Sequence, residues 1–212
     1  MIYAENILIC LTLPLAITSL FVGGSTRRFI ISFISGAVVC LLSAYIGSFV
    51  EYMTAGMGSE DYSVFISPIV EEIVKFLPVI FYLLLFEPSN RQLMLVTVGI
   101  GAGFATLENS CYILTSGAYS LTYILIRGLA VGVMHLVCMV ALSMGLALLR
   151  YHKVSSFSGT IGALSLAMSF HALYNLLVSK PGASSYIGYA LPIICAVFLY
   201  FLFQRFKAFT EM

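Results

Sequence analysis

The sequence contains seven apolar stretches, each long enough to cross a lipid bilayer as a helix. They cover residues 2–22, 29–50, 63–86, 93–115, 121–149, 157–178 and 184–203. A bilayer core of about 30 Å requires about 20 residues of α-helix. Charged or turn-forming residues, such as Lys180-Pro181-Gly182, separate these stretches. The pattern predicts an all-α polytopic membrane protein with about seven transmembrane helices.

The composition excludes most other classes of protein. Of the 212 residues, 61% are hydrophobic and 9% are charged, whereas about 25% are charged in soluble domains. So few charges cannot cover the surface of a soluble enzyme, and a net charge of +1 provides no basic field for nucleic acid. The expected partners are therefore the lipid bilayer and membrane-anchored molecules, with no nucleic acid.

The organisation of the chain is simple. No long polar segment interrupts it, so residues 1–212 are expected to form one transmembrane helical domain, with the chemistry-bearing core at 63–178. The first stretch carries Glu5 in place of the cations of a signal peptide, and we expect it to be a membrane span. The five cysteines lie in apolar stretches without a CxxC pair and are expected to be buried hydrophobic residues.

The distribution of cations predicts the orientation. With the N-terminus outside and the C-terminus inside, the outer segments hold only Lys180, beside the acidic Glu51, Glu60 and Asp61. Of the ten Lys and Arg residues, seven then fall on the cytoplasmic side: Arg27, Arg28, Arg91, Arg150, Lys153, Arg205 and Lys207. This distribution follows the positive-inside rule. We therefore expect a multi-pass protein of the cell membrane.

Several ionisable residues lie inside the predicted helices, where a central charge costs about 2.5–3.5 kcal/mol on the insertion scale. They are Glu71, Glu72, Lys75, Glu108, Arg127, His135 and His171. At 1.5 Å per residue, Glu71, Glu108 and His171 lie about 10–12 Å beneath the outer edge, and His135 lies deeper. Four helices thus place polar groups in one layer. We expect a buried polar site that opens to the outside.

The residue types in this layer suit peptide-bond hydrolysis by activated water. A carboxylate beside an imidazole can polarise a water molecule, and a His with an Asn can stabilise a developing oxyanion. His171 and Asn175 are four residues apart and share a helix face. Lys75 can offset the negative charge and orient a Glu. No covalent nucleophile is needed, and Cys138 is not expected to be one because an apolar environment disfavours the thiolate.

Four short motifs in this region resemble those of the PrsW-type glutamic intramembrane proteases, which are relatives of the CAAX prenyl endopeptidases. Glu71-Glu72-Ile73-Val74-Lys75 resembles the EExxK motif, and Phe104 to Asn109 resembles the second motif. The single His135 resembles the third motif, and His171 to Asn175 resembles the HxxxN motif. The resemblance covers residues 68–178. It implies cleavage of membrane-anchored, single-span proteins, such as a bacterial anti-sigma factor, on the extracytoplasmic side.

The chain departs from the CAAX relatives at two positions. They carry EExxxR and FxxxH, whereas this chain has Lys75 one residue earlier and Glu108 where that His would stand. Glu71 must then act with either Glu108 or His135. We expect Glu71 to be the base with His135 assisting and Glu108 as a second acid, and His171 and Asn175 to contact the oxyanion. Glu72 is expected to share protons with its neighbour.

Other readings of the same residues remain open. Glu and His could ligate zinc, although HExxH is absent and carboxylates outnumber histidines, so no metal or cofactor is expected. The chain also resembles, more distantly, the seven-helix scaffold subunit of gamma-secretase, which is not itself a protease. Buried Glu, Lys and His also occur in proton-coupled carriers. Arg127 is expected to pair with a Glu or to reach the headgroups, and the Gly99/Gly103 and Gly128/Gly132 spacings favour close helix packing.

Overall fold

The computed structural model describes residues 4–54, 56, 58–116, 120–151 and 157–205, and all regular elements in these ranges are helices. They are α1 (Ala4–Phe21), α2 (Gly24–Met53), α3 (Ser59–Asp61), η1 (Tyr62–Ile66), α4 (Ser67–Leu85), α5 (Asn90–Ser116), α6 (Leu121–Ile126), η2 (Arg127–Val131), α7 (Gly132–Tyr151), α8 (Phe157–Val178) and α9 (Ala183–Arg205). The π-helix η1 joins α3 to α4 without a break, and the π-helix η2 joins α6 to α7. Lys153 and Lys207 lie outside the described residues.

The prediction of an all-α polytopic membrane protein is confirmed. Among the described residues, six helices are long and apolar enough to cross a membrane: α1, α2, α5, the continuous α6–α7 helix, α8 and α9. The segment formed by α3, η1 and α4 is the seventh long helix, and it carries Glu71, Glu72 and Lys75. Large apolar side chains such as Phe21 on α1 and Phe201 on α9 are exposed, as expected for surfaces that lipid covers.

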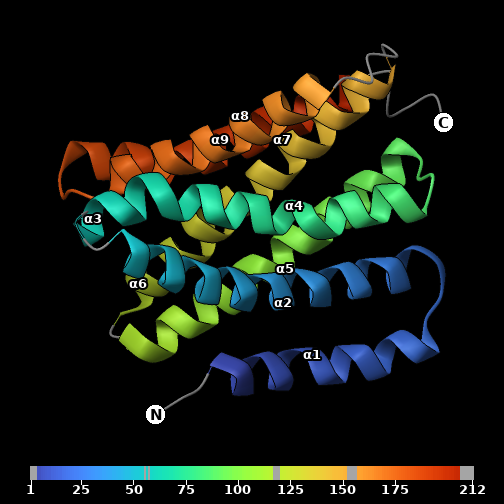
Figure 1. The fold of residues 1–212 in the computed structure, drawn as a ribbon, viewed down its shortest axis with the longest axis horizontal. Helices are drawn as coiled ribbons and strands as arrows, with labels where there is room; N and C mark the ends of the chain where they lie inside the picture. Colours follow the sequence, from blue (N-terminus) through green and yellow to red (C-terminus); the bar gives the residue numbers. More distant parts are fainter. Residues whose placement is uncertain (1–3, 55, 57, 117–119, 152–156, 206–212) are drawn as a thin grey trace.

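The helices α5 and α7 lie in the middle of the molecule. Figure 1 shows α1 at one edge and α8 and α9 at the other, with α5 and α7 crossing between them. The main apolar core lies between α2, α4, α5 and α7 and includes the fully buried residues Val79, Leu93, Ile100 and Met139. The polar residues of α4, α5 and α7 therefore face this interior instead of lipid.

Glycines allow α2 and α5 to pack closely. A Cβ added to Gly36 would lie 2.0 Å from the Ile100 carbonyl oxygen, and one added to Gly103 would lie 1.9 Å from that of Phe33. Close packing at the Gly99/Gly103 spacing is therefore confirmed. The same prediction is wrong for Gly128, which has no atom within 4 Å of its added Cβ because it lies in η2 and faces open space.

Candidate active site

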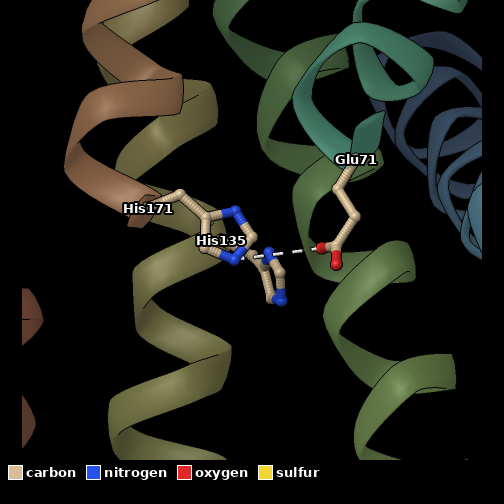
Figure 2. A group of neighbouring side chains, drawn as sticks. All are labelled: Glu71, His135 and His171. Carbon is tan, nitrogen blue, oxygen red and sulfur yellow. Dashed lines mark ion pairs between the residues drawn. The ribbon is translucent and has the colours of Figure 1, made fainter. Parts of the chain in front are cut away.

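The structure brings together the ionisable residues of four helices that are far apart in sequence. Helix α4 supplies Glu71, Glu72 and Lys75, and α5, α7 and α8 supply one residue each: Glu108, His135 and His171. Figure 2 shows Glu71, His135 and His171 converging from three of these helices. The depths of these residues below the predicted helix ends predicted this convergence.

Lys75 is the centre of the buried network. It is fully buried, and its Nζ donates to Glu72 Oε1 at 2.5 Å. The same Nζ lies 3.0 Å from Nδ1 of His135 and 4.4 Å above the centre of the Phe104 ring. An ammonium has three hydrogens and no acceptor. It therefore donates to His135 Nδ1, and the proton of the neutral imidazole resides on Nε2.

Glu108 accepts hydrogen bonds from two side chains of the continuous α6–α7 helix. Nε2 of His135 donates to Glu108 Oε2, and Nη2 of Arg127 lies 3.3 Å from Glu108 Oε1. The Arg127 guanidinium also stacks at 4.0 Å over the Tyr112 ring. Arg127 thus pairs with a carboxylate, which is one of the two roles expected from the sequence, and it neutralises Glu108.

The π-helix η2 explains how Arg127 and His135 reach the same carboxylate. Eight residues of regular α-helix leave an angle of about 80° between two side chains. One extra residue in a π-turn removes about 100° of rotation, so that the two side chains lie within about 20° of each other. The Asn109 side chain also donates to the Arg127 carbonyl at 3.2 Å, which anchors this turn to α5.

Among the three carboxylates of this cluster, Glu71 is the one without a Lys or Arg partner. Its Oε1 accepts a hydrogen bond from Ser67 at 2.7 Å, and its Oε2 is buried without a hydrogen-bond partner among the described residues. His171 lies beside it. In the neutral imidazole of His171, Nδ1 donates to Glu72 Oε1 at 2.8 Å and Nε2 carries the lone pair, 3.9 Å from Glu71 Oε2. The gap is too long for a direct hydrogen bond and suits a bridging water.

A cavity of about 460 Å³ opens beside these residues and includes Glu71, Glu108, Arg127 and His171 in its wall. Asn175 lies on the same wall, and its side-chain amide donates to the Ser63 carbonyl at 2.9 Å. An amide has two hydrogens, so the second remains for a bound molecule. Four of the seven residues predicted for the site therefore line this cavity. The other three, Glu72, Lys75 and His135, lie behind its wall and are bonded to His171 and Glu108.

A metal site is suggested by geometry and opposed by the hydrogen bonds. One candidate ligand atom from each of Glu71, His135 and His171 lies within 4.8 Å of the other two, and a catalytic zinc has three such protein ligands. However, the lone pair of His135 faces the Lys75 ammonium and its ring proton faces Glu108. As bonded in the structure, only Glu71 and His171 can ligate, so the residues do not fit a catalytic zinc.

Three side chains of the site were not predicted from the sequence. Ser67 binds Glu71, Phe104 lies under Lys75, and Tyr112 lies under Arg127. The contact between Ser67 and Glu71 could have been predicted from the sequence, because Ser67 precedes Glu71 by four residues and therefore lies on the same helix face. Phe104 likewise precedes Glu108 by four residues in the second motif.

Carboxylates, imidazoles and an amide surround a cavity inside a bundle of membrane-spanning helices, and these are groups that acid–base hydrolysis uses. The family model described as PrsW family intramembrane metalloprotease matches residues 24–203. The chain therefore belongs to the PrsW family, and its general activity is intramembrane proteolysis. No curated protein and no solved structure matches the chain.

Proposed function

We propose that the chain is a glutamic protease that hydrolyses a peptide bond of single-span, membrane-anchored proteins near the extracytoplasmic face of a bacterial cell membrane. Cleavage of an anti-sigma factor is one reaction of this kind. The observation that carries the proposal is the unequal pairing of the three carboxylates in the cluster. Lys75 neutralises Glu72 and Arg127 neutralises Glu108, whereas Glu71 receives only the Ser67 hydroxyl.

Water held between Glu71 and His171 is the nucleophile in this proposal. It donates one hydrogen to Glu71 Oε2 and the other to the lone pair of His171 Nε2, which leaves its oxygen free to attack the carbonyl carbon. This differs from the role expected from the sequence, since His171 presents an acceptor and not a donor. His135, whose two nitrogens bind Lys75 and Glu108, becomes a positioning residue.

The remaining steps use the same groups. Glu71 takes a proton from the attacking water, and the second N–H of Asn175 donates to the developing oxyanion. Glu71 then gives its proton to the departing amide nitrogen as the C–N bond breaks. The products are a carboxylic acid and an amine, and Glu71 returns to its ionised form.

The test is cleavage of a quenched fluorescent peptide with one apolar span of about 20 residues, by purified protein in detergent. Glu71→Gln keeps the size of the side chain and removes the base, and we expect kcat to fall by about 10²–10⁴-fold. Glu60→Gln, at an exposed acidic residue of α3, is the matched control and should retain full activity. Normal turnover by Glu71→Gln would overturn the proposal.

A zinc-dependent form of the same hydrolysis is the second candidate, favoured by the proximity of Glu71, His135 and His171. Cleavage in the presence of a metal chelator distinguishes the glutamic mechanism from the zinc-dependent one. We expect unchanged cleavage in its presence, whereas loss of activity that zinc restores would support the second candidate. A folded wild-type protein that cleaves no span peptide, with or without zinc, would favour the non-catalytic scaffold.

A further inference from the structure

Two separate cavities reach the proposed base. The cavity of about 460 Å³ described above lies between α4, α5, α6–α7 and α8, and a second cavity of about 250 Å³ lies on the α2 side. Both include Ser67, Glu71, Glu108 and Tyr112 in their walls. These four residues are the part of the wall that the two cavities share.

The α2-side cavity has the size and lining of a water site. Its wall contains the hydroxyls of Ser43, Ser48 and Tyr62 and the carboxylate of Glu51, with Cys40 also in the wall. At about 30 Å³ for each water, its volume holds several ordered waters. Tyr62 crosses to α2, where its hydroxyl donates to the Gly47 carbonyl at 2.7 Å. This bond holds η1 against α2 beside the cavity.

The larger cavity has the lining of a peptide site. Its wall includes several aromatic and aliphatic residues, among them Tyr123, Tyr174, Tyr189 and Val178, with Asn175 as a polar group that orients a ligand. Binding sites for organic ligands combine a mostly apolar lining with a few placed polar groups. A peptide in this cavity would cover Glu71 from that side and would exclude water from it.

We infer that the α2-side cavity supplies the hydrolytic water to Glu71 while the larger cavity holds the substrate segment. The inference rests on the proposed function, because it assigns a role to each side of the same base. One water is consumed in each turnover, and a bound substrate closes the larger cavity. A second path lets water reach the base without release of the substrate.

Filling each cavity in turn separates their roles. Ala44 lines only the α2-side cavity and Val178 only the larger one, and neither belongs to the catalytic machinery. With the span peptide as substrate, Ala44→Phe should lower kcat at least tenfold and leave KM within twofold. Val178→Phe should raise KM severalfold. A rise in KM with unchanged kcat for Ala44→Phe, or unchanged kinetics in a folded variant, would overturn the inference.

A native cysteine gives a readout that does not depend on activity. In a variant that retains only Cys40, which is 7% exposed, hydroxyl radicals generated from water by X-ray irradiation should oxidise the thiol in the folded state, and adding Ala44→Phe should block this labelling. A variant that retains only Cys138, which is fully buried beside Ala167, should stay unlabelled. Protection of Cys40 in the folded protein would exclude a wet cavity. Activity of Glu71→Gln would instead refute the proposed function, whatever the labelling shows.

Discussion

Removing the ammonium of Lys75 should destabilise the protein strongly, and removing its partner as well should restore most of the lost stability. Lys75→Met leaves the Glu72 carboxylate, which is 1% exposed, without its cation. Breaking a buried ion pair by removing one partner costs about 3–5 kcal/mol. His135 also loses the donor to its Nδ1, for which the typical cost is about 1 kcal/mol.

The double variant Glu72→Gln/Lys75→Met removes both charges. A Gln at position 72 still offers a carbonyl oxygen to Nδ1 of His171, and Met fills most of the volume of Lys. Replacing both members of a buried pair is often close to neutral, so we expect a loss within about 2 kcal/mol. The two substitutions should therefore show a coupling energy of at least about 2 kcal/mol.

The assay is denaturant-induced unfolding in detergent micelles, followed by the helical circular dichroism signal. Arg91→Met, at an exposed cation on α5, is the control and should change the free energy of unfolding by less than about 0.5 kcal/mol. Two results would refute a stabilising ion pair between Glu72 and Lys75. One is a loss of less than about 1 kcal/mol in the free energy of unfolding for Lys75→Met. The other is a loss for the double variant that equals the sum of the losses for the two single variants.

Three further predictions concern orientation, substrate and packing. With the N-terminus outside, a membrane-impermeant thiol reagent should label Ser184→Cys from outside and Ser89→Cys only from inside, and the reverse pattern would invert the orientation. Because the site lies about 10–12 Å below the predicted outer edge, mass spectrometry should map the cut within a few residues of the outer end of the substrate span, and a cut in its cytoplasmic half would contradict this access. Gly103→Leu should lower the unfolding temperature markedly because its Cβ would meet the Phe33 carbonyl, whereas Gly162→Ala, which faces open space, should have little effect.

The sequence predicted which residues meet, but not which residue binds which. Counting residues from the helix ends gives the depth of each side chain, and depth alone placed Glu71, Glu108 and His171 at one level, with His135 deeper. Depth does not give the direction in which each side chain points around its helix axis, and this direction decides which residues bind each other. On a helix Lys75 can reach either Glu71, four positions before it, or Glu72, three positions before it. The structure pairs it with Glu72 and places its ammonium over the Phe104 ring.

The two π-turns account for a further part of what could not be predicted. η1 precedes the catalytic stretch of α4, and the Ser67 N–H in this turn donates to the Tyr62 carbonyl. Pro68 follows directly and lacks an N–H, so it cannot make the α-helical bond to Val64. Each π-turn rotates all following side chains by about 100° relative to a regular helix. A reading that assumes regular helices therefore assigns wrong neighbours even where the depth is right.

The pairing of charges leads to a last prediction, in which stability and activity change in opposite directions. A lone charge inside the membrane costs about 2.5–3.5 kcal/mol, and Glu71 alone among the three carboxylates of this cluster has no cation. Ser67 is half-buried, borders both cavities and lies on the Glu71 face of α4.

Ser67→Lys would place an ammonium beside Glu71, where the unpaired carboxylate now accepts only a hydroxyl. We expect the unfolding temperature to rise and cleavage of the span peptide to fall by at least about 10²-fold, because a paired carboxylate is a weaker base. Ser67→Ala, which removes one hydrogen bond and adds no charge, should lower activity only modestly. Cleavage by Ser67→Lys at the wild-type rate would contradict this prediction. It would show that catalysis does not require an unpaired carboxylate at Glu71.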